Sequence, residues 1–333
     1  PTAPASTPLR GEENSHRPTP PPYKNNSPKT PHTNKPFPAG SKTRVATMGH
    51  DDFKSNEKSW VAAHDDVLTI RHTAADGTET VLKSDLKVLP REIIDATFLS
   101  AKALDAFLAE TQDAAKADDV LYSVHLKATM MKVSDPIIFG HVVRSYFADV
   151  FARYGDKIAA AGLDPNNGLG AILAGLAEVE GGAEIIAAFN DALASGARVS
   201  YVNSDKGITN LHVPSDVIVD ASMPALVRNG GKLWGADGGE EDTIAVIPDS
   251  SYAGVYQAVI DDVIANGPLD PAKIGTVPNV GLMAQAAEEY GSHDKTFEIA
   301  ADGIVQVLDS SGEVLIEHTV EKGDIWRATQ TKH

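Results

Sequence analysis

Two lysines, Lys127 and Lys132, lie in mostly apolar company in the stretch HLKATMMKVSDPIIFGH, residues 125–141. The apolar run VLYSVHL predicts a buried strand with Lys127 just past its carboxyl end. Ligands usually bind at that end of an open α/β sheet, and a partly desolvated lysine there can act as a base or hold a carboxylate. The alternative is that both ammonium groups extend along the surface into solvent.

Two carboxylates, Asp216 and Asp220, come four residues apart in PSDVIVDASMPALV. On the helix expected over Asp216–Arg228 this spacing places both on one face, where they could hold Mg²⁺ or Mn²⁺ through oxygen ligands. Acidic residues in the first turns of a helix also compensate the helix dipole. Asp216, beside Ser215, fits that second interpretation better.

A third polar group, formed by Tyr290, His293, Asp294 and Lys295, falls within six residues of EEYGSHDKTFEI. It stands at the end of an expected helix that leads into a strand. A tyrosine beside a lysine and a histidine could serve as a general acid. The alternative is an ordinary polar loop.

The elements that must position these residues alternate between strands and helices. A hairpin is expected around the Asp76-Gly77 turn, then a helix capped by Ser100 and the buried strand. A helix over about 136–155 follows, with Asp135 as its N-cap and Pro136 in its first position. This order predicts an α/β fold with a mixed sheet covered by helices. Further helices are expected at about 169–179, 182–196, 216–228, 251–265 and 281–291, and strands at 198–203 and 243–249.

The chain divides into an irregular start and an α/β domain. Residues 1–60 are rich in Pro, Ser, Thr and Asn without periodicity and are expected to be irregular, whereas residues 61–333 form the domain. The hairpin-first pattern returns near the end, around a Ser311-Gly312 turn, so we expect a weak duplication, with a first repeat at about 61–200 and a second, truncated repeat from about 300. The truncation and the absence of a starting Met indicate a piece of a longer protein.

Composition narrows the class of protein. The chain has 333 residues, 42% of them hydrophobic, which is enough for a substantial core and about two domains. It contains no Cys, no long apolar run and no signal-peptide pattern, which argues against a disulfide scaffold and a membrane protein. A net charge of −17 argues against nucleic-acid binding, which needs a basic field. We therefore expect a cytoplasmic protein that binds neither nucleic acid nor membrane.

Several long motifs together resemble the monomeric NADP-dependent isocitrate dehydrogenases. They are HLKATMMKVSDPIIFGH, NSDKGITNLHVPSDVIVDASMP, VIPDSSYAGVYQ, TVPNVGLMAQAAEEYGSHDKTFEIAADG and GDIWRATQTK. The resemblance runs from about Val45 to Thr331 and continues more weakly upstream. It implies an isocitrate/isopropylmalate dehydrogenase-like fold, in which this chain is the middle portion of a longer enzyme, chiefly an inserted domain built from a duplicated α/β unit.

The resemblance also implies a reaction and roles for named residues. The reaction is the oxidation of isocitrate by NADP⁺ and its decarboxylation with Mg²⁺ or Mn²⁺, a step of the tricarboxylic acid cycle carried out by a monomer. Lys127 would act near the C2 hydroxyl of isocitrate, and Tyr290 would deliver a proton after decarboxylation. Asp220 would bind the metal, while Arg10 and Arg17 would hold substrate carboxylates. The NADP-binding residues and the other metal ligands would lie outside this chain.

The start of the chain departs from the family pattern. Ala3 and Ser6 stand where the family has a Ser and an Asn before the first substrate arginine, and one extra residue separates Arg10 from Arg17. The lost groups would touch substrate. We therefore expect a fragment of such an enzyme that is inactive alone. The alternative is a non-catalytic remnant with the same α/β fold.

Overall fold

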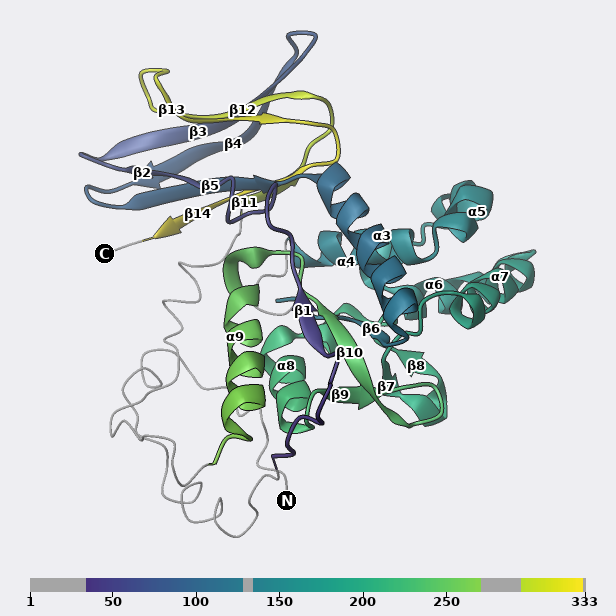
Figure 1. Cartoon of the computed structure of the whole chain (residues 1–333). Helices are drawn as coiled ribbons and strands as arrows, with labels where there is room; N and C mark the ends of the chain where they lie inside the picture. The colour runs from purple at the N-terminus through teal and green to yellow at the C-terminus, as the bar shows by residue number, and fades with distance from the viewer. Residues whose placement is uncertain (1–33, 128–133, 271–294, 332–333) are drawn as a thin grey trace, which may run out of the picture.

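The computed structural model describes residues 34–127, 134–270 and 295–331. Over these residues the chain is a mixed α/β structure, which confirms the predicted class. Figure 1 shows a sandwich of two antiparallel sheets at one end and a parallel sheet among helices at the other. No helix in the described ranges is long and apolar enough to cross a membrane.

A short parallel sheet lies at the centre of the helical end. Its strands are, in spatial order, β1 (Arg44–Ala46), β10 (Glu240–Val246) and β6 (Leu121–Val124), and β9 (Lys232–Trp234) pairs antiparallel with β10. In this register Val246 lies between Ala46 and Val124. Because the three strands point the same way, their carboxyl ends meet at one edge of the sheet.

Helices cover both faces of this sheet. They are α3 (Ala101–Asp118), α4 (Asp135–Tyr146), α5 (Ala148–Ala160), α6 (Leu169–Leu176), α7 (Gly182–Ser195), α8 (Val219–Arg228) and α9 (Ser250–Asn266). Tyr122 and Val124 of β6 pack in the core shared with α3–α7, whereas Leu121 and Ala245 pack in the core shared with α8 and α9. Burial on both faces explains the near-continuous apolar run of β6.

The remaining regular elements near the parallel sheet are short. They are β7 (Tyr201–Asn203), β8 (Ile208–Thr209) and three 3₁₀ turns at Pro165–Asn167, Ser204–Lys206 and Pro214–Val217. The expected strand at 198–203 is thus reduced to β7, although Val199 forms a further bridge to Tyr122.

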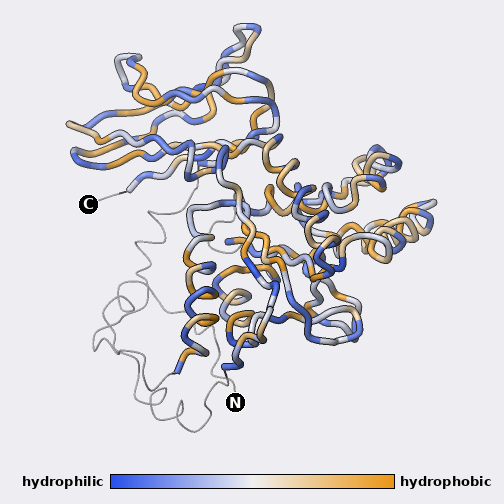
Figure 2. The backbone as a smooth tube through the Cα atoms, in the orientation of Figure 1, coloured by the Kyte–Doolittle hydropathy of each residue, from blue (hydrophilic) through white to orange (hydrophobic). Residues whose placement is uncertain are grey.

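Two four-stranded sheets make up the sandwich. One runs β13 (Val314–Val320), β12 (Gly303–Leu308), β3 (Asp66–Ala74), β4 (Glu79–Val88), and the other runs β11 (Lys295–Glu298), β14 (Ile325–Thr331), β5 (Ile93–Leu99), β2 (Lys58–Val61). Inward-facing side chains of both sheets share one core around Trp326. Hydrophobic and hydrophilic residues alternate along these strands, as Figure 2 shows, because one face of each sheet is buried and the other is wet.

The two hairpins occupy equivalent places in the sandwich. Each turns through a glycine with positive φ, Gly77 at 86° and Gly312 at 88°. β3 pairs antiparallel with β12, and β5 pairs antiparallel with β14. In the first pairing Arg71 lies opposite Gln306, and in the second Ala96 lies opposite Ala328. Both pairs join corresponding positions of the two similar sequence segments, so the arrangement has an approximate twofold symmetry.

Two expectations about elements need correction. The segment expected to be irregular contains β1 and β2, and only its residues 1–33 lie outside the described ranges. The helix expected to run on from Pro136 breaks at Phe147, between α4 and α5. Tyr146 and Phe147 are both buried at this break, which lets two consecutive aromatic side chains enter the core.

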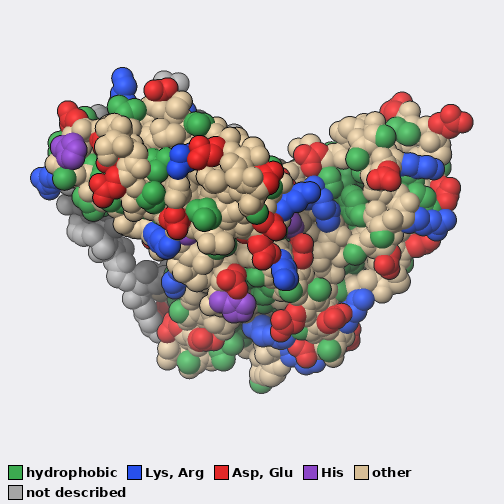
Figure 3. Space-filling view, turned by 90° about the horizontal axis from the view of Figure 1, so that it is seen from above, with side chains coloured by type: hydrophobic (Ala, Val, Ile, Leu, Met, Phe, Trp, Pro, Cys, Tyr) green, Lys and Arg blue, Asp and Glu red, His purple; other side chains and the backbone are tan. Residues whose placement is uncertain are grey.

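Charged side chains of both signs are mixed on one face of the molecule. On the face shown in Figure 3, acidic and basic side chains are interspersed, and a notch separates two masses of the molecule. The net charge of −17 therefore does not take the form of a single acidic patch on this face.

The close pairing of β3 with β12 gives a test of the sandwich. A Cβ added at Gly303 would collide with the backbone oxygen of Thr73 on the neighbouring strand. Gly303→Ala should therefore lower the free energy of unfolding by roughly 1–3 kcal/mol, measured by urea denaturation. Gly155→Ala in α5 is the matched control, since nothing lies within 4 Å of its added Cβ, and it should leave stability unchanged or raise it. Equal effects of the two substitutions would contradict the pairing.

Candidate active site

The candidate site lies where chain segments leave the carboxyl edge of the parallel sheet. Lys127 comes three positions after Val124, the last residue of β6, and Asp249 comes three positions after Val246, the last residue of β10. Val124 and Val246 are partners in the parallel register. Lys127 and Asp249 therefore leave the sheet at the same level, at the edge where open α/β sheets bind ligands.

A short extension of the sheet brings Lys127 to Asp220. Leu126 forms a parallel β-bridge with Ile218, and the N–H of Val219 donates to the carbonyl of Leu126 at 2.7 Å. Helix α8 begins at Val219, so Asp220 in its first turn lies beside Lys127. The Nζ atom of Lys127 is 3.0 Å from Oδ1 and 3.2 Å from Oδ2 of Asp220.

This ion pair is partly open to solvent. The side chains of Lys127 and Asp220 are 24% and 44% exposed. Nζ of Lys127 also lies 5.9 Å from the centroid of the Tyr252 ring. A pair this exposed contributes about 0–1 kcal/mol to stability. Its chemical interest is that an ammonium group and a carboxylate are presented together, within reach of a ligand.

His125 fixes the position of α8 relative to β6. Its Nδ1 lies 2.6 Å from Oγ of Ser222, whose hydroxyl donates to the carbonyl of Ile218 at 2.9 Å. Because the hydroxyl proton is used in that bond, we assign the ring proton to Nδ1 of His125. Burial lowers the pKa of His125 to about 3, so the ring is neutral. The link holds the carboxylate of α8 near Lys127.

A buried group of charges lies behind this pair. Arg327 of β14 reaches Asp249, the N-cap of α9, at 3.4 Å, and its side chain is 6% exposed. Asp135, in the first turn of α4, is also buried. None of these three residues was predicted to belong to a site. Arg327 directly follows Ile325 and Trp326 in the sequence, and a charge beside such apolar residues was a signal that it is buried and needs partners.

The carboxyl group of Asp135 is held in an unusual environment. Its pKa is raised to about 7, chiefly by burial and also by the nearby Asp249. Arg327 and both the backbone N–H and the ammonium group of Lys127 oppose this rise. The expected N-cap role of Asp135 is wrong. Ser134 occupies the N-cap position, and Asp135 points into the protein from the first turn instead.

Sequence comparisons place the chain in a family. A sequence model described as monomeric isocitrate dehydrogenase matches residues 3–333. The isocitrate dehydrogenase [NADP] of Corynebacterium efficiens is 63% identical over 325 residues, which is 98% of this chain and 45% of that protein. The enzymes of the same name from Corynebacterium glutamicum and Azotobacter vinelandii are 62% and 50% identical over 98% of this chain and 44% of their own length.

The chain belongs to the monomeric isocitrate dehydrogenase family. It spans less than half of the length of these relatives. The expectation that the chain is inactive alone finds no support in the matches, which compare sequences and not activities.

The structure brings together two of the residues that the family resemblance singles out. Lys127 and Asp220 form the ion pair described above. Arg10, Arg17 and Tyr290 lie outside the described residues, as does Lys132.

Asp216 and Asp220 do not share a helix face, which corrects the expectation from their spacing. Asp216 lies in the 3₁₀ turn Pro214–Val217, and α8 starts only after Ile218. Ile218 has extended backbone, with φ −64° and ψ 115°, because it forms the bridge to Leu126. This pairing interrupts the helix between the two carboxylates.

A divalent metal would have one carboxylate here. In the ranges 34–127, 134–270 and 295–331 no cluster of three His, Asp or Glu side chains could hold an ion. Mg²⁺ is commonly bound through one or two carboxylates, with substrate oxygens and water completing its shell. The exposed carboxylate of Asp220 fits the part of one such ligand, and any further protein ligand must come from elsewhere.

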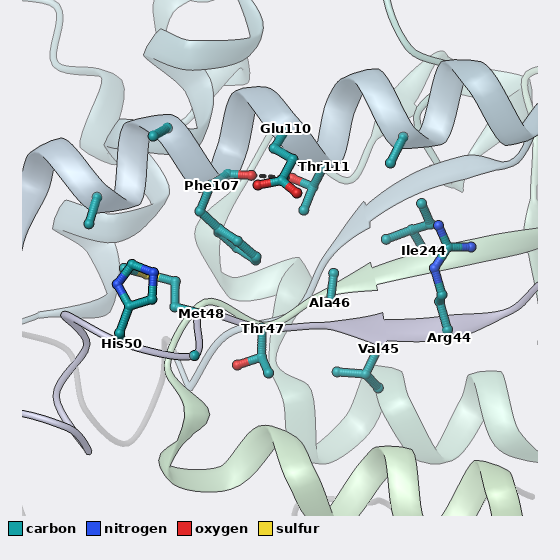
Figure 4. Close-up of a pocket in the computed structure, with 14 residues that line it drawn as sticks. Arg44, Val45, Ala46, Thr47, Met48, His50, Phe107, Glu110, Thr111 and Ile244 are labelled. Carbon is teal, nitrogen blue, oxygen red and sulfur yellow. Dashed lines mark hydrogen bonds between the residues drawn. The ribbon is translucent and has the colours of Figure 1, made fainter.

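A separate cavity of about 590 Å³ lies between β1 and α3 (Figure 4), and neither Lys127 nor Asp220 is among the residues that line it. Its lining groups are mostly engaged already. Arg44 pairs with Asp118 at 2.7 Å, and the hydroxyl of Thr111 donates to backbone carbonyls of its own helix. The view shows no convergent set of polar groups comparable to the Lys127–Asp220 pair.

The buried carboxyl group of Asp135 predicts a pH-dependent stability. Its folded pKa of about 7 lies above the usual 3.8, so between these values the folded state retains a proton that the unfolded state loses. The contribution of this carboxyl group to the free energy of unfolding should therefore fall as pH rises from about 4 to 7. Asp135→Asn removes this loss, so the variant should gain stability relative to the parent chain between pH 5 and pH 8.

Urea denaturation at the two pH values measures this difference. The exposed Asp113→Asn on α3 is the control and should show no such gain. A stability difference between Asp135→Asn and parent that is constant with pH, or that falls, would show that Asp135 is ionised in the folded protein throughout.

Proposed function

We propose that this chain is part of an NADP-dependent isocitrate dehydrogenase. The complete enzyme would transfer a hydride from C2 of isocitrate to NADP⁺, release the hydroxyl proton, and then lose CO₂ to give 2-oxoglutarate. The observation that carries the proposal is the Lys127–Asp220 ion pair at the carboxyl edge of the sheet, in a chain of this family. The names of the relatives support the substrate and NADP as the cofactor.

Lys127 would act on the C2 hydroxyl of the substrate. Its ammonium group is oriented by Asp220 and lies over the Tyr252 ring, so a substrate oxygen that approaches Asp220 also meets Nζ of Lys127. In its neutral amine form a lysine in this place can accept the hydroxyl proton, and in its ammonium form it can return the proton and stabilise negative charge that develops on the oxygen.

Asp220 would be one ligand of Mg²⁺ or Mn²⁺. When bound, such an ion would polarise the substrate oxygen as a Lewis acid. The part played by the chain is to keep the carboxylate beside Lys127. The His125–Ser222 contact and the Leu126–Ile218 bridge do this from two directions.

The remaining roles rest on the family resemblance alone. Tyr290 would protonate the product of decarboxylation, and Arg10 and Arg17 would hold substrate carboxylates. We also propose that the sandwich is the duplicated, inserted domain of the family. The symmetric pairing of its two hairpins supports this. A monomer in the cytoplasm is the expected form of the complete enzyme.

A chimera tests the proposed function. This chain would replace the matching 45% of the Corynebacterium efficiens relative, so that all remaining residues come from a protein of the same family. We expect the chimera to form NADPH from NADP⁺ only when isocitrate and Mn²⁺ are present. Lys127→Met should lower kcat by roughly 100-fold or more, because the proton-transfer group is lost, with unchanged circular dichroism.

Lys35→Met is the matched control. Lys35 also forms an ion pair, with Glu240 at 2.9 Å, but this pair lies on the surface at the amino end of β10, opposite the carboxyl edge of the sheet. It should leave kcat unchanged. A folded chimera without NADPH formation would favour the non-catalytic remnant, and a normal kcat in Lys127→Met would remove this lysine from the chemistry.

A further inference from the structure

A charged side chain of the sandwich, that of Arg327, extends into the helical end of the molecule, close to the candidate site. Arg327 lies on β14, next to Ala328, which pairs with Ala96 at the approximate symmetry centre. The corresponding residue of the other half, next to Ala96, is Asp95, which bonds to the neighbouring Ser59 on the sandwich itself. Arg327 thus breaks the symmetry of the sandwich, and its guanidinium group is buried among residues of the helical end.

Three separate segments meet this guanidinium group. It donates to Oγ of Ser134 at 3.0 Å, pairs with Asp249 at 3.4 Å, and lies 3.4 Å from the ring centroid of Phe53. Ser134 begins α4, Asp249 begins α9, and Phe53 lies in the segment that follows β1. A planar guanidinium group can stack and donate in several directions at once, which a lysine cannot do.

Charge balance makes the arginine necessary at this place. Asp135 and Asp249 are both 2% exposed, and Arg327 is a cation close to both. Without the cation, the buried carboxylate of Asp249 would lose its ion-pair partner and would move toward solvent. That movement would displace the first turn of α9, and the loss of the hydrogen bond from Arg327 to Ser134 would release the first turn of α4.

Those first turns are the ones that face Lys127. The carboxyl group of Asp135 lies near the backbone N–H of Lys127 and interacts electrostatically with the ammonium group of that lysine. Tyr252, in the first turn of α9, presents its ring to Nζ and is close to the same backbone N–H. Whatever holds these two turns in place also fixes the backbone of Lys127.

We propose that Arg327 is a positioning residue for Lys127. By joining the starts of α4 and α9 to the sandwich, it sets where the ammonium group stands relative to Asp220. The sandwich is then not only a scaffold, because one of its strands supports the chemistry of the helical end. The inference about Lys127 as a catalytic group rests on the proposed function, whereas the inference about its position does not.

Hydrogen exchange in this chain tests the positioning without any assay of activity. Arg327→Lys keeps the positive charge but cannot reach Ser134 and Asp249 together. We expect amide exchange to rise about tenfold or more in residues 121–127 and in the first turns of α4 and α9, measured by mass spectrometry. Exchange in β3 and β12 should stay at the parent level.

Arg71→Lys is the matched control. Arg71 contacts Gln306 and Glu79 in the other sheet of the sandwich, and its variant should leave exchange at residues 121–127 unchanged. If Arg327→Lys does not fold, Ser134→Ala removes one of the contacts and should give the same pattern at about threefold. No change at residues 121–127, or an equal rise throughout the chain, would overturn the proposal.

The chimera adds a catalytic readout. There Arg327→Lys should lower kcat about tenfold or more while the KM for isocitrate changes less than threefold, and Arg71→Lys should change neither. A raised KM with normal kcat would contradict the positioning role. If the chimera has no activity at all, the proposed function fails, and the exchange experiment still decides whether Arg327 positions Lys127.

Discussion

The parallel pairing of β10 with β1 and β6 is the constraint on which the site depends. It aligns the ends of the strands, so that Lys127 and Asp249 leave the sheet at the same level. A shift of this register by one residue would also exchange the two faces of each strand, and with them the two helical cores. The burial of β6 on both faces therefore fixes the place of Lys127 as firmly as any contact of the lysine itself.

Two further connections complete the candidate site at the carboxyl edge of the parallel sheet. The bridge between Leu126 and Ile218 brings the start of α8 to the end of β6, and Asp220 comes with it. On the other side, Arg327 joins the starts of α4 and α9 to the sandwich. One connection consists of backbone pairing, and the other consists of a buried ion pair and a hydrogen bond. Because these contacts hold the chain segments in place, the partly exposed Lys127–Asp220 pair does not have to stabilise the site itself.

The sequence predicts local features well and long-range ones poorly. The hairpin turns at Gly77 and Gly312, the N-cap Ser100 and the strand before Lys127 follow from short patterns, and the structure contains all of them. The break between Asp216 and Asp220 could not be predicted, because it results from pairing with Leu126, 92 positions away from Ile218. The burial of Arg327 had a local signal, but its partners Ser134 and Asp249 could not be predicted because they are distant in sequence.

We propose that Lys127 and Asp220 form the substrate end of an isocitrate dehydrogenase site, and a crystal structure of the chimera with isocitrate and Mn²⁺ would test this. We expect density for isocitrate with its C2 oxygen within hydrogen-bond distance of Nζ of Lys127, and Mn²⁺ coordinated by Asp220. Isocitrate or Mn²⁺ bound elsewhere, with the Lys127–Asp220 pair facing only solvent, would contradict it.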